Sequence, residues 1–133
     1  MCDDSETLSF NVGLMNKALR IILEKGRMSD NDVVLDAGSG DGRIVGLLAG
    51  VFGISTVGVE CDHELVQRSR NNIRYLNEIR IIEETKAEIV EGNFNLDKTY
   101  SEWGIEFADF SIVFSYSNNQ ERLAEKIGLQ SKK

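Results

Sequence analysis

The chain has 133 residues, enough for one domain with a modest hydrophobic core and too few for a second domain. Its formal net charge of −7 argues against the basic face that nucleic-acid phosphates require, whereas a basic protein partner stays compatible. The acidic N-terminus carries no apolar run and no stretch approaches membrane-spanning length, so we expect neither a secretory signal nor a membrane segment.

Two cysteines, Cys2 and Cys61, bear on the compartment. Neither has the spacing of a metal ligand, and two cysteines do not build a disulfide scaffold. We therefore expect free thiols, and a cytoplasmic location for the protein.

The N-terminal part is expected to form a flexible tail over residues 1–10 and an amphipathic helix over residues 11–26. Apolar side chains recur there at helical spacing, at Val12, Met15, Leu19, Ile22 and Leu23. We expect this helix to cover one face of a sheet. The alternative is that its start and the tail fold over a ligand as a lid.

The stretch 32–50 combines a strand, a glycine loop and a helix. Val33-Val34-Leu35 is typical of a buried parallel strand, and residues 44–49 of the helix that follows. Between them lie the alternating glycines Gly38, Gly40 and Gly42. A Cβ at any of these would block either positive φ angles or the close approach of the backbone to a nucleotide-like ligand.

The remaining chain alternates strands with helices. Runs of β-branched or apolar residues predict three more strands, at 55–60, 87–91 and 108–114. Helices are expected at 65–79, after an Asp62 cap, and at 118–127, with one helical turn near 100–103. The core, residues 32–127, is thus an α/β Rossmann-like parallel sheet with right-handed crossovers and helices on both faces.

Polar residues follow each strand, at the edge where a doubly wound sheet binds its ligand. Asp36 and the glycine loop lead into a helix N-terminus, which favours an approaching carboxylate or phosphate. Glu60 suits the two hydroxyls of a ribose, and the Gly92-Asn93-Phe94 run suits the edge of an adenine. Residues 115–119 place polar side chains after the fourth predicted strand. Each feature alone is a weak signal, so the joint occurrence is what indicates one ligand site.

Three motifs carry a resemblance. Val33-Val-Leu-Asp-Ala-Gly-Ser-Gly-Asp-Gly-Arg43, Val57-Gly-Val-Glu60 and Val90-Glu-Gly-Asn-Phe94 together resemble the first motifs of the class I (seven-strand) S-adenosylmethionine-dependent methyltransferases. Their glycine spacing differs from the Gly-x-Gly-x-x-Gly of nicotinamide enzymes, which disfavours that reading. The strings are more weakly similar to the protein-lysine methyltransferases of the disruptor-of-telomeric-silencing type and their small prokaryotic relatives. The chain has no proline, which excludes the proline-containing motifs of several nucleic-acid methyltransferases.

The resemblance implies S-adenosylmethionine as cofactor, no metal, and methyl transfer to an amine such as a protein lysine, or to a small molecule. It places the cofactor against Asp36 and the loop at the methionine end, Glu60 at the ribose, and the rest around the adenine and the methyl group. The implied cofactor residues are Asp36, Gly38, Ser39, Gly40, Asp41, Gly42, Glu60, Cys61, Asp62, Asn93, Phe94 and Ser115. Tyr116 and Asn118 are the candidates for orienting the amine, and His63 is expected as a solvated neighbour of the helix cap.

The chain departs from that family after the fourth strand. The family sheet has the order 3-2-1-4-5-7-6, and this sequence stops before a fifth strand, which leaves the order 3-2-1-4 and an exposed edge. Truncation is the favoured explanation; a minimal domain that dimerises through its fourth strand and one half of a split enzyme are the alternatives. A non-catalytic module that binds S-adenosylmethionine, or nothing, and acts through a partner chain therefore stays open beside the enzyme.

Overall fold

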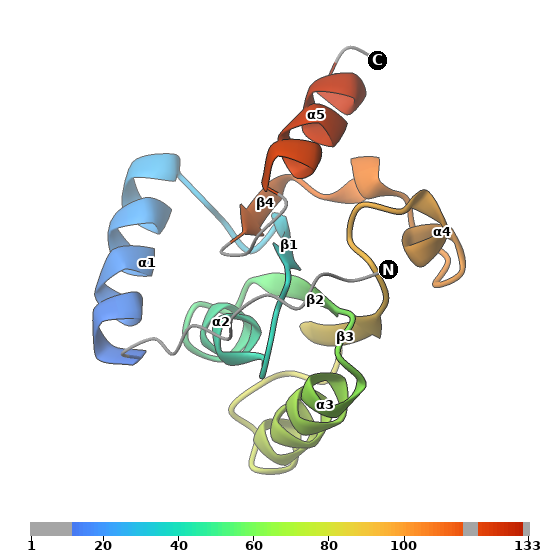
Figure 1. The fold of residues 1–133 in the computed structure, drawn as a ribbon. Helices are drawn as coiled ribbons and strands as arrows, with labels where there is room; N and C mark the ends of the chain where they lie inside the picture. The colour runs from blue at the N-terminus through green and yellow to red at the C-terminus, as the bar shows by residue number, and fades with distance from the viewer. Residues whose placement is uncertain (1–11, 116–119, 132–133) are drawn as a thin grey trace.

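The computed structural model describes residues 12–115 and 120–131, and Figure 1 shows a parallel sheet with helices on both sides. The sheet contains β1 (Val33–Ala37), β2 (Ser55–Glu60), β3 (Ala87–Glu91) and β4 (Ile112–Ser115). Their order is β3-β2-β1-β4, and all neighbours run parallel. The predicted strand order and fold class are confirmed.

Among the described residues, five α-helices pack around the sheet, as can be followed in Figure 1. They are α1 (Val12–Gly26), α2 (Arg43–Gly46), α3 (His63–Glu78), α4 (Asp97–Ser101) and α5 (Gln120–Ser131). A π-helical segment, Leu47–Val51, continues α2. Helices α1 to α3 cover one face, whereas α4 and α5 cover the other.

Alternating side chains of β1 explain the two layers. Val34 packs with Leu19 of α1 and Leu48 of the π-helical segment. Its neighbour Leu35 points the other way, into a cluster with Tyr100 of α4 and Leu123 of α5. Because successive side chains of a strand leave opposite faces, a strand covered on both sides needs an unbroken apolar run.

The fourth strand is shorter than the sequence predicts, because it begins at Ile112 rather than at residue 108. Residues Phe107–Asp109 form a 3₁₀ turn, closed by reciprocal hydrogen bonds between Glu106 and Asp109. The turn buries Phe107 and contains Ala108, and Phe110 follows it with an extended backbone outside the strand, so none of these residues belongs to the sheet. The predicted helical turn near 100–103 lies slightly earlier, as α4.

Helix α1 confirms the predicted helix, although its apolar stripe is narrower than expected. Leu19 is buried and Leu23 packs against the same cluster, but Ile22 is 49% exposed. Three parts of the sequence predictions lie outside the described residues: the side chains of Val12 and Met15, the tail 1–10, and residues 118–119, where the last helix is expected to begin. As far as the structure describes them, none of the helices combines the length and apolar character of a membrane span.

Candidate functional site

The glycine loop after β1 has the backbone that the sequence predicts. Gly38, Gly40 and Gly42 have φ angles of 81°, 56° and 83°, which side chains with a Cβ rarely adopt. The backbone N–H groups of Gly38 and Ser39 both donate to the carbonyl oxygen of Val59, at 2.9 and 3.0 Å. These bonds fasten the loop to the end of β2.

The glycines of this loop serve different purposes. A Cβ built at Gly40 would meet no described atom within 4 Å, so its backbone faces open space. A Cβ at Gly42 would lie 3.0 Å from the Cβ of Ser69, a buried residue of α3. Gly42 therefore allows α3 to pack closely, and Gly40 keeps the loop backbone accessible.

Ser39 turns its side chain toward the sheet. A Cβ at Gly58 of β2 would lie 2.7 Å from both the Cβ and the Oγ of Ser39, so the serine occupies the space that the glycine leaves. The Ser39 Oγ is buried and has no hydrogen-bond partner among the described residues. The Ser39 side chain therefore packs the loop against β2, and its hydroxyl is not exposed for a ligand.

Two carboxylates lie at the ends of the neighbouring strands β1 and β2. The Glu60 Oε2 accepts a hydrogen bond from the Gly40 N–H at 2.9 Å, and its Oε1 accepts one from the Asp62 N–H at 3.1 Å. Asp36, beside Gly58 in the register, is only 3% exposed. Burial and then the charge of Glu60 raise the pKa of Asp36 from 3.8 to about 7.

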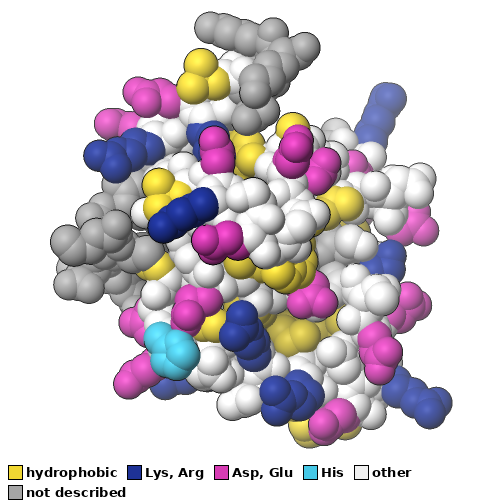
Figure 2. All heavy atoms as spheres, turned by 90° about the vertical axis from the view of Figure 1, so that its right-hand side faces the viewer, with side chains coloured by type: hydrophobic (Ala, Val, Ile, Leu, Met, Phe, Trp, Pro, Cys, Tyr) yellow, Lys and Arg dark blue, Asp and Glu magenta, His cyan; other side chains and the backbone are white. Residues whose placement is uncertain are grey.

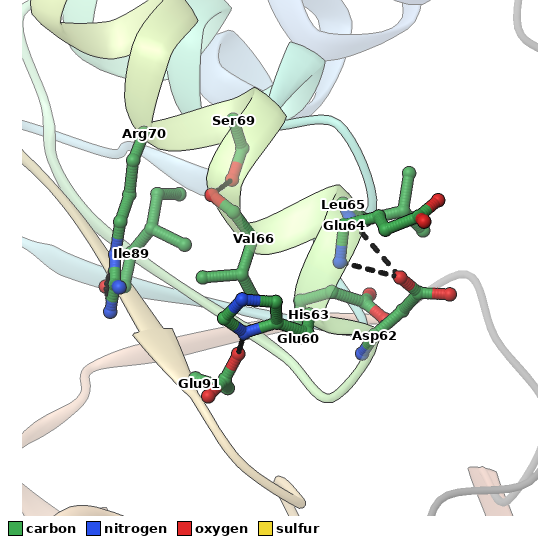
Figure 3. A network of polar contacts seen from close by, with 10 residues as sticks. All are labelled: Glu60, Asp62, His63, Glu64, Leu65, Val66, Ser69, Arg70, Ile89 and Glu91. Carbon is green, nitrogen blue, oxygen red and sulfur yellow. Dashed lines mark hydrogen bonds and ion pairs between the residues drawn. The ribbon is translucent and has the colours of Figure 1, made fainter.

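The start of α3 is tied to the end of β3 in the network that Figure 3 shows. The Asp62 Oδ1 accepts hydrogen bonds from the N–H groups of Glu64 and Leu65, which confirms the predicted cap. His63 was expected only as a solvated neighbour of this cap. Its ring is indeed exposed, but its Nδ1 lies 2.6 Å from the Glu91 Oε1, so it also links the helix to β3.

The loop after β3 contains the predicted residues Asn93 and Phe94, and two side chains of α4 that the sequence does not predict hold it in place. The Asn93 Oδ1 accepts from the Asn95 N–H at 2.9 Å, which shapes the turn, and Phe94 packs half-buried against the core. The Thr99 Oγ1 donates to the Asn93 carbonyl at 2.7 Å, and the Tyr100 hydroxyl donates to the Phe94 carbonyl at 2.5 Å. Both donors come from α4, and no local pattern in the sequence marks them.

Other predicted site residues have diverse surroundings. The Asp41 Oδ2 pairs with the Arg43 Nε at 2.8 Å, and Ser115 ends β4 beside Ala37. Cys61 is disulfide-bonded in this structure, so the expectation of a free thiol is wrong for this residue. Cys2, like the catalytic candidates Tyr116 and Asn118, lies outside the described residues. Among those described, no group of three or more His, Cys, Asp or Glu side chains is arranged to hold a metal ion.

Comparisons with known proteins show which sequences and folds this chain resembles. No protein-family model matches the chain. A curated protein-lysine N-methyltransferase of Saccharolobus islandicus (strain REY15A) is 34% identical over 112 residues, which are 84% of this chain and 63% of the relative. An RNA methyltransferase of Salinibacter ruber, solved in complex with S-adenosyl-L-homocysteine, is 26% identical with a TM-score of 0.64, over 86% of this chain and 67% of that one. The chain has the class I methyltransferase fold.

A further class I methyltransferase fold supports the assignment. A solved protein-L-isoaspartate O-methyltransferase matches 86% of this chain and 32% of its own with a TM-score of 0.58, at 18% identity. The chain spans 63% of the length of the curated lysine methyltransferase that it resembles. The methyltransferase fold brings together Asp36, the glycine loop and Glu60, and Asn93 lies in the loop after the next strand, β3.

Proposed function

We propose that this chain binds S-adenosylmethionine and forms part of an enzyme that methylates an amine, such as the side chain of a protein lysine. The observation that carries the proposal is the accessible backbone at Gly40 directly beside the Glu60 carboxylate. Asn93 lies in the loop directly after the neighbouring strand β3. Methionine, ribose and adenine would thus lie in this order along the carboxyl edge of β1, β2 and β3.

The polar side chains of the site can still accept further hydrogen bonds from such a ligand. Each oxygen of Glu60 accepts one backbone N–H, and each has a further lone pair for a ribose hydroxyl. The Asn93 Oδ1 likewise accepts one N–H and has a second lone pair for the adenine amino group. Asp36 and the loop backbone would hold the methionine end. Asp41, Cys61, Asp62, Phe94 and Ser115 complete the proposed set.

When bound, the cofactor supplies a methyl group activated by its positive sulfonium. The chain has to align the amine with that methyl group and to exclude water, because a displacement of this kind needs little covalent help. The amine must also lose its proton before it can attack. Tyr116 and Asn118, just beyond the end of β4, are the residues that we propose to orient it.

A protein lysine is the acceptor that we favour. The relative from Saccharolobus islandicus is named for this acceptor, and the net charge of −7 attracts a basic protein segment. The solved neighbour from Salinibacter ruber is described as an RNA methyltransferase. On the face in Figure 2, acidic and basic side chains are interspersed, so this face offers no single basic patch for RNA phosphates.

Calorimetry with S-adenosylhomocysteine tests the cofactor. We expect the wild-type chain to bind, and Glu60→Ala to weaken binding about 10- to 100-fold, because hydrogen bonds to a charged carboxylate are lost. Glu88→Ala is the matched control, since Glu88 is an exposed glutamate of the neighbouring strand β3. An inability of the wild-type chain to bind would overturn the cofactor proposal.

A radiolabelled-methyl assay on cell extract tests the acceptor. Label in protein, lost after the extract's lysines are chemically blocked, would support the lysine proposal. Label only in the small-molecule fraction would replace it by a small-molecule acceptor. Tight binding without any transfer would instead indicate a non-catalytic module that acts through a partner chain.

A further inference from the structure

Two consecutive hydroxyl side chains of α4 hold two consecutive carbonyls of the loop after β3. Thr99 donates to Asn93 at 2.7 Å and Tyr100 donates to Phe94 at 2.5 Å. Thr99 is 6% exposed and Tyr100 is 1% exposed, so water does not compete for these hydroxyls. A partly buried carbonyl that loses its donor carries a desolvation cost, and the two bonds therefore restrict where this loop can lie.

Steric contact adds to these hydrogen bonds. A Cβ at Gly92 would lie 2.7 Å from the Thr99 Cγ2 and 2.9 Å from its Oγ1, so Thr99 reaches the Asn93 carbonyl only because residue 92 is glycine. The Gly92 N–H in turn donates to the Glu60 carbonyl at 2.9 Å. The position of α4 is thereby transmitted to the end of β2, where the ribose would bind.

The ring of Tyr100 is itself held firmly. It meets Phe107 edge-on at a centroid distance of 5.5 Å and Phe110 at 5.9 Å. The Lys126 ammonium of α5 lies 5.8 Å from the centre of the same ring and also pairs with Asp97. Burial, and then the charge of Asp97, raises the pKa of the Tyr100 phenol, so the hydroxyl stays protonated and able to donate.

We propose that Thr99 and Tyr100 are positioning residues that set the adenine preference of the cofactor site. They touch no part of the proposed ligand. They act through Asn93, whose amide oxygen would accept from the adenine amino group, and through the backbone of Phe94, which would flank the ring. The inference rests on the proposed cofactor and adds a specificity device to it.

The test compares two ligands on the full chain by calorimetry. S-Adenosylhomocysteine carries the adenine amino group, and S-inosylhomocysteine carries an oxygen in its place. We expect wild type to prefer the adenine ligand. Tyr100→Phe and Thr99→Val should each weaken the binding of S-adenosylhomocysteine about three- to tenfold, because the hydrogen bond between Asn93 and the adenine amino group loses its alignment. The same variants should change the affinity for S-inosylhomocysteine less than about twofold.

Matched variants separate positioning from folding. Thr99→Ser keeps the hydroxyl and should restore the wild-type preference, whereas Tyr75→Phe removes the hydroxyl of an exposed tyrosine of α3 and should change nothing. An equal loss for both ligands, or no loss, in Tyr100→Phe and Thr99→Val would overturn the positioning role. A wild-type chain that binds S-adenosylhomocysteine without preference would overturn it as well. A wild-type chain that binds neither ligand would overturn the proposed cofactor first and this inference with it.

Discussion

Replacing Gly40 by alanine separates a backbone cost from a ligand cost. Gly40 has a φ of 56°, and an added Cβ would meet no described atom within 4 Å. The substitution should therefore destabilise the protein only by the left-handed penalty of about 1–2 kcal/mol. For a chain of this size we expect the melting temperature to fall by roughly 3–8 °C.

Gly53→Ala is the matched control. Gly53 has a φ of 66° and likewise no described atom within 4 Å of its built Cβ, but it precedes β2 and so lies at the opposite edge of the sheet. Both variants should lose similar stability in thermal unfolding. Only Gly40→Ala should weaken the binding of S-adenosylhomocysteine, by about tenfold or more in calorimetry, because the added methyl group would lie where the loop backbone approaches the ligand. Wild-type affinity in Gly40→Ala, or an equal loss in Gly53→Ala, would refute this reasoning.

Substitutions at three further positions test the surroundings of the site. A raised pKa of about 7 means that ionisation of Asp36 opposes folding, so stability should fall between about pH 4 and pH 7 and then level off. Urea unfolding of Asp36→Asn and wild type at pH 5 and pH 8 measures this effect. The free energy of unfolding of Asp36→Asn, relative to wild type, should be up to about 3 kcal/mol higher at pH 8 than at pH 5. An equal difference at both pH values would contradict the raised pKa of Asp36. Gly58→Ala should cost about 1–3 kcal/mol in urea unfolding, because its Cβ would lie 2.7 Å from Ser39 and 2.9 Å from Val45. An unfolding midpoint of Gly58→Ala equal to that of wild type would show that the glycine loop moves away from the added Cβ without cost. Asp62→Ala should cost about 1 kcal/mol by removing the cap of α3, and Asp62→Asn should recover most of it in the same assay.

Local patterns were sufficient to predict most of the strands and the class of the sheet. β-branched runs mark β2 and β3 with the bounds that the structure shows, and alternating glycines mark the loop with positive φ angles. These signals are local because pleating, turn geometry and apolar runs act over a few residues. The alternation of strands and helices predicts parallel pairing with right-handed crossovers, whereas the strand order came from the resemblance to the class I methyltransferases.

The detailed contacts at the site depend on how the helices pack. Gly40 and Gly42 look alike in the sequence, and only the place of Ser69 in α3 gives them different roles. His63 and Glu91 meet because α3 packs over β3. Thr99 and Tyr100 reach the loop after β3 because α4 turns back onto it. The carboxylate, amide and glycine backbone at the strand ends are thus determined by the sequence itself, whereas their alignment depends on packing between segments that no local pattern encodes.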